Sequence, residues 1–166
     1  MTVTVQSALG EVRAAARRLR DLVRELVLTA VEDQPRNCQV HLVMVVHDAA
    51  LDVAAEAEQA DAALDREEPQ AGPPASPSQA VAHCQHHVTM LGTVLVRELA
   101  APELINDLSA LGREHGREVS AWVGETIRRI QACQMALWTD VQPALLGYWR
   151  ELADITDRRR VSGDGR

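Results

Sequence analysis

One short stretch of the chain concentrates the side chains that bind metals. The sequence VAHCQHHVTM, residues 81–90, holds three of the six histidines and one of the three cysteines. On a helix His83 shares a face with His86 and His87, because three or four residues make about one turn. Two imidazoles on one face can hold a transition metal, but a closed site needs further ligands. The stretch therefore leaves two interpretations open, a metal site or an exposed polar helix face.

A second stretch, LGREHG at residues 111–116, adds another histidine in a suggestive position. His115 follows Leu111 by four residues, so the leucine can pack on the face of a flat ligand that the imidazole meets. Upstream, His86 and Met90 lie one turn apart in the same way. Two helices could thus offer one histidine each across a gap.

Periodic apolar residues predict the helices that must position these side chains. Ser7 is the expected N-cap of the first helix, Pro102 suits the first turn of the fourth, and Gly116 should break the chain. A strand at residues 40–46 is an alternative for the start of the second helix. The six expected helices cover residues 7–33, 38–65, 78–100, 102–115, 119–138 and 140–158.

Two segments look unlike the rest of a helical core. The second half of the second helix is rich in Asp and Glu, which predicts a solvated arm. Residues 67–78 contain four prolines and no periodicity, which is typical of an extended connector. Together, residues 48–78 form an expected insertion in a single domain of residues 1–158, followed by a disordered tail at residues 159–166.

The composition narrows the fold and function classes. A chain of 166 residues suffices for one domain, and a 46% hydrophobic content without any Phe favours a core of aliphatic residues between helices. All 17 basic residues are Arg, which we attribute to a GC-rich bacterial genome, and the net charge of −7 argues against nucleic-acid binding. No signal peptide or apolar run of membrane-spanning length is visible, and scattered cysteines suggest neither a disulfide framework nor structural zinc. We therefore expect a cytoplasmic protein.

Several segments resemble globins. HHVTMLGTVLVREL is similar to the distal helix of that family, PELINDLSALGREHG to the proximal helix, and VSAWVGETIRRI and PALLGYWRELADI to the two helices that follow. LVRELVLTAVEDQP at residues 22–35 resembles the second globin helix and its proline turn. The resemblance covers residues 22–41 and 80–156 and implies an all-α, globin-like domain of about six helices.

The resemblance implies a site for haem b between two helices. His115 would be the proximal iron ligand, and His86 would be the distal residue, with Gln85 in its place if the register slips by one. The implied activity is binding or sensing of a diatomic gas such as O2 or NO, and an oxidase or dioxygenase cycle would need an external reductase, so catalysis stays open. The other implied haem contacts are Leu111, Met90, Val123, Ile127 and His41, the last standing where globins place a phenylalanine.

A related group fits the same segments without a cofactor. The insertion, the short corner of three residues between His115 and Val119, and the missing phenylalanine resemble the cofactor-free globin-like domains of bacterial stress and PucR-type regulators. This alternative implies a regulatory or protein-interaction module that associates with a regulatory partner. Trp138, Tyr148 and Trp149 suggest a homodimer formed through the last two helices.

Overall fold

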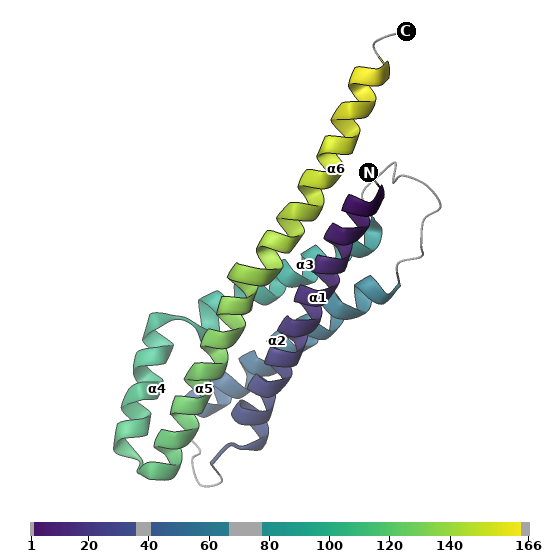
Figure 1. The fold of residues 1–166 in the computed structure, drawn as a ribbon. Helices are drawn as coiled ribbons and strands as arrows, with labels where there is room; N and C mark the ends of the chain where they lie inside the picture. The colour runs from purple at the N-terminus through teal and green to yellow at the C-terminus, as the bar shows by residue number, and fades with distance from the viewer. Residues whose placement is uncertain (1, 36–40, 67–77, 164–166) are drawn as a thin grey trace.

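The chain forms long helices that pack side by side (Figure 1). The computed structural model describes residues 2–35, 41–66 and 78–163, and over these residues it contains no strand. The predicted all-α class is confirmed. The elements are α1 (Thr2–Val27), η1 (Leu28–Glu32), α2 (His41–Asp65), α3 (Gln79–Val94), η2 (Leu95–Leu99), α4 (Pro102–Glu114), α5 (Arg117–Ala136), η3 (Leu137–Val141) and α6 (Gln142–Gly163), where η marks a π-helix.

Helix α1 packs on α2 on one side and on α5 and α6 on the other. Its expected apolar stripe is buried at Val12, Leu19, Val23 and Leu26. The proposed N-cap at Ser7 is wrong, since the helix already begins at Thr2 and Ser7 is an exposed residue inside it. At the other end the wide turn of η1 leaves the carbonyl of Thr29 to accept a hydrogen bond of 2.8 Å from the indole of Trp122.

Helix α2 lies between α1 and α3, and its acidic second half belongs to the core. The expectation of a solvated arm is wrong, because small buried residues alternate with the acidic ones and let both neighbours approach closely. The strand alternative at residues 40–46 is also wrong for its described part, which is helical from His41. The buried residues of the acidic half are Ala49, Ala50, Val53, Ala57, Ala60, Asp61, Ala63 and Leu64.

The expected start of α3 near residue 78 and the expected start and end of α4 are confirmed. Ser78 caps α3 by accepting a hydrogen bond from the Val81 amide, and Pro102 is the first residue of α4. Gly116 has a φ of 87° and separates α4 from α5. Because this backbone region is open almost only to glycine, Gly116 can reverse the chain there.

Helices α5 and α6 form one continuous rod with η3 between them, residues 117–163, which we call the rod (Figure 1). The expected break at residues 138–140 is wrong. Pro143 suggested a new helix, because proline lacks an amide hydrogen and its ring collides with the carbonyl four residues before it. The π-helical turn of η3 directly precedes Pro143 and alters that spacing, so the helix continues through the proline.

The rod extends beyond the expected end of the last helix at Arg158, since residues 159–163 are helical. Figure 1 shows this end of α6 projecting past the other helices. Residues 164–166 and residues 67–77 of the expected connector lie outside the described residues. Among the described helices, none is both long and apolar enough to cross a lipid bilayer.

Candidate functional site

The expected proximal ligand lies at the end of α4. His115 is the C-cap residue and is exposed, and both its backbone amide and its Nδ1 lie 3.2 Å from the carbonyl oxygen of Leu111. The imidazole therefore covers the last turn of its own helix. This position agrees with the preference for histidine at the negative end of a helix dipole.

The expected distal residues lie on the exposed side of α3. His86 is exposed and meets the ring of His87 edge to face, with ring centroids 5.3 Å apart. Met90 is exposed one turn later, and His41 is an exposed residue at the start of α2. Helix α3 packs mainly on α2 and helix α4 mainly on α5, so the helices that carry His86 and His115 have different main packing partners.

The other expected haem contacts belong to the packed contact between α4 and α5. Leu111 and Val123 are buried, and Ile127 is half-buried against the same core. A Cβ added at Gly112 would lie 3.4 Å from both the Cα of Ser120 and the Cβ of Val123. The glycine thus allows the two helices to touch directly beside Leu111. Haem binding stays a prediction.

The histidine cluster of α3 also has a structural partner. Nδ1 of His87 lies 2.6 Å from Oε2 of Glu56, which joins α3 to α2. His83 and His86 point into solvent on the exposed side of the helix. Within the described ranges no three His, Cys, Asp or Glu side chains come together in a way that could hold a metal ion.

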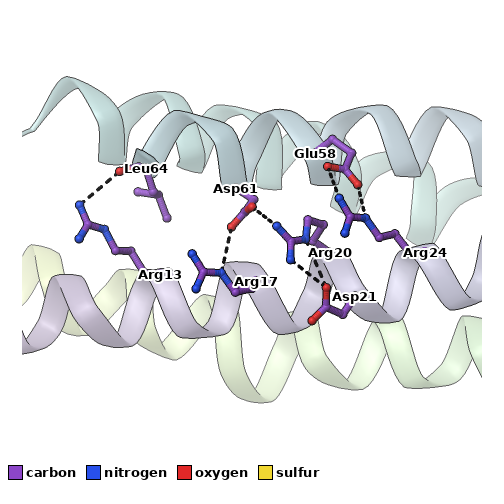
Figure 2. A network of polar contacts seen from close by, with 8 residues as sticks. All are labelled: Arg13, Arg17, Arg20, Asp21, Arg24, Glu58, Asp61 and Leu64. Carbon is purple, nitrogen blue, oxygen red and sulfur yellow. Dashed lines mark hydrogen bonds and ion pairs between the residues drawn. The ribbon is translucent and has the colours of Figure 1, made fainter. Parts of the chain in front are cut away.

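A row of arginines on α1 forms the main polar network of the structure, and we call it the arginine ladder (Figure 2). Its members recur every three or four residues, so they lie along one face of α1 toward α2. At one end of the row Arg13 donates to the Leu64 carbonyl at 3.2 Å, and at the other end Arg24 donates two hydrogen bonds to the exposed carboxylate of Glu58. The ladder consists of Arg13, Arg17, Arg20 and Arg24.

Asp61 is the buried centre of this network. Its carboxylate accepts a hydrogen bond from Arg20 and lies 4.0 Å from Nε of Arg17, and its side chain is only 8% exposed. The hydrogen bond from Arg20 to Asp21 is the main reason why the pKa of Arg20 lies above its usual value; the charge of Asp61 adds to that rise, while burial opposes it. The geometry is that of a clamp between two helices, because each acidic group is matched by guanidinium groups of α1.

Neither of the two cysteines that the structure describes is a reactive thiol. Cys84 and Cys133 are buried and free, and burial raises the pKa of each thiol to about 12. A nearby carboxylate, of Asp61 for Cys84 and of Glu25 for Cys133, adds to the rise. A thiol needs to ionise before it can attack, so neither side chain is suited to nucleophilic chemistry.

The most unusual surface of the molecule is an apolar stripe on the rod. Met135, Trp138 and Leu146 are 64%, 56% and 51% exposed, and we call these three residues the rod stripe. They succeed one another along the solvent side of the rod, where the residues facing α1 are buried. Beside them, the half-buried Trp149 is fixed by a hydrogen bond of 2.6 Å from its Nε1 to Oε1 of Gln85 on α3.

Only some of these features were predicted from the sequence. Trp138 and Trp149 were expected interface anchors, but Met135 and Leu146 were missed because apolar residues are assigned to the core by default. The arginine ladder was also not predicted. The spacing of Arg13, Arg17, Arg20 and Arg24 was the signal that could have revealed it.

Comparison of the chain with protein-family models, with curated proteins and with solved structures gave no match. The function is therefore argued from the residues of this chain alone.

Proposed function

We propose that this protein is a helical protein-interaction module that docks a partner on the rod stripe. The observation that carries the proposal is the exposure of Trp138, with Met135 and Leu146 on the same side of one helix. An exposed tryptophan side chain does not gain the favourable free energy that burial would give it. Exposed apolar patches commonly mark interaction sites. Trp and Met are also enriched at protein interfaces.

The rest of the structure supports a docking surface of fixed shape. The rod is packed along α1, and the ion pairs of Arg129 with Glu25 and of Arg18 with Asp140 connect α1 to the rod, the first before the stripe and the second within its span. A partner therefore meets a straight helix face that needs no rearrangement. Preformed surfaces of this kind bind at a lower entropic cost than mobile ones.

A photo-crosslinking experiment in the cells that make the protein tests this function. Benzoylphenylalanine replaces Trp138 in one variant and the exposed Gln59 of α2 in the control. We expect a discrete crosslinked product from position 138 and none from position 59. Equal or absent crosslinking at the two positions would contradict a docking role for the rod stripe.

The haem hypothesis needs a separate measurement. If His115 ligates a haem iron, hemin added to the purified protein should give a saturable Soret band that the His115→Ala variant loses and the His47→Ala control keeps. A protein that gives no such band would contradict haem binding.

A further inference from the structure

We propose that the partner of the rod stripe is a second copy of this chain, whose rod lies antiparallel to the first across a two-fold axis at Gln142. This inference rests on the proposed docking function and names its occupant. It uses the distribution of apolar and charged residues along the solvent side of the rod.

The apolar residues are arranged symmetrically about Gln142. Trp138 and Leu146 lie four residues before and after it, and Met135 and Trp149 lie seven residues before and after it. In a two-fold symmetric interface every residue pair occurs twice, because the contact made by one copy is repeated with the two copies exchanged. Antiparallel rods would thus place Trp138 on the partner's Leu146 twice, and Met135 beside the partner's Trp149 twice.

The charges on the same side favour this direction of the second rod. Arg128 lies fourteen residues before Gln142 and Asp157 lies fifteen after it. Antiparallel rods therefore bring Arg128 opposite the partner's Asp157. Parallel rods would instead bring every charge opposite its own copy, and such like-charge contacts select against an orientation.

Arg128 and Glu125 already form an exposed ion pair, with 2.6 Å between Nη2 and Oε2. The partner's Asp157 would extend this pair to a group of three alternating charges at each end of the interface. The centre would be apolar and the ends charged, which is the usual organisation of a protein interface.

The projecting end of α6 gives a second reason for a partner rod. Every residue from Thr156 to Gly163 is exposed, including Val161 at 78%. Short helices without packing contacts are only marginally stable in water. In the antiparallel arrangement this end lies along residues 121–128 of the partner, where Ala121 and Gly124 leave room for Val161 because a Cβ on Gly124 would meet nothing within 4 Å.

Sedimentation equilibrium on the purified full chain provides the first test. We expect a dimer whose dissociation constant rises at least about 30-fold in Trp138→Ser, the size of effect typical of a central interface residue. Arg128→Glu and Asp157→Arg should each weaken the dimer, and the variant carrying both changes should recover most of the lost affinity. This rescue also separates an interface effect from misfolding, since a folding defect would not be repaired by the second reversal.

Disulfide trapping tests the position of the axis, in a Cys38→Ser background. Gln142→Cys meets its own copy on the axis and should form a crosslinked dimer under mild oxidation. Gln131→Cys, eleven residues away, should not crosslink alone but should do so when combined with Ala153→Cys. Cys84 and Cys133 do not interfere because they are buried.

The outcomes distinguish this inference from the docking function itself. A dimer that crosslinks through Gln131→Cys alone would be parallel and would overturn the antiparallel arrangement. A chain that stays monomeric at 100-fold the concentration found in its cells would overturn the second copy as partner. If position 138 then gives a crosslinked product whose mass differs from that of a dimer, the docking function still stands. Monomers without any product from position 138 would overturn both.

Discussion

Removing the Asp61 carboxylate tests whether the arginine ladder stabilises the contact between α1 and α2. The side chains of Asp61 and Arg20 are 8% and 19% exposed, so Asp61→Ala leaves a largely buried guanidinium without its buried partner. Complete loss of one partner of a buried pair costs about 3–5 kcal/mol. Arg20 keeps its hydrogen bonds to Asp21, and Arg17 is 59% exposed and adds little, so we expect a loss of about 2–3 kcal/mol in the free energy of unfolding.

Urea unfolding followed by circular dichroism at 222 nm measures this loss as a lower midpoint with an unchanged slope. Asp61→Asn keeps an oxygen that accepts a hydrogen bond from Arg20, so this variant should lose less of the free energy of unfolding. The matched control is Glu58→Gln, which removes the exposed pair with Arg24 and should leave the midpoint within error of wild type. The reasoning is refuted if Asp61→Ala unfolds at the wild-type midpoint, or if the Glu58 variant loses as much as the Asp61 variant.

Three further predictions concern buried and strained positions. Burial raises the pKa of Cys84 and Cys133 to about 12 from an ordinary 9.0, so site-resolved alkylation at pH 8 should require unfolding. The stability that these neutral thiols contribute should be complete below pH 9 and decrease as the pH rises toward 12. Rapid labelling of the native protein would contradict this. Among the described residues Thr126 buries a hydroxyl without a hydrogen-bond partner, so Thr126→Val should raise the free energy of unfolding by about 1 kcal/mol, whereas Thr126→Ser should not. Gly116→Ala should lower it by about 2 kcal/mol because of the φ of 87°, while Gly10→Ala inside α1 should raise it by up to about 1 kcal/mol; changes of equal sign would disprove the backbone argument.

The helices and their ends were predictable where local chemistry decides them. The α1 stripe from Val12 to Leu26, the cap at Ser78 and the break at Gly116 follow from periodicity, capping and backbone conformation. These features depend on residues within one or two turns of each other. The all-α class follows from the same local patterns.

The errors arose where packing between segments distant in sequence decides whether a residue is buried or exposed. The acidic half of α2 looked solvated, but α1 supplies the arginines that neutralise Asp61 and Glu58, and no pattern within α2 reveals them. The prediction of His86 and His115 as a facing pair is of another kind and stays a prediction. It depends on the relative placement of α3 and α4, which sequence spacing within each helix does not determine.

The π turn within the rod affects how the chain tolerates changes in length. Buried residues Cys133, Leu137, Val141 and Leu145 follow one another at intervals of four. In a regular α-helix, with about 100° per residue, each such step would rotate the buried side by about 40°. The wider turn of η3 absorbs this drift and keeps α6 on α1. Loss of one residue between 137 and 141 would convert the joint to an ordinary α-helical turn and keep α6 in phase, but the ring of Pro143 would then collide with the carbonyl four residues before it. The same loss after Tyr148 would rotate everything that follows out of phase.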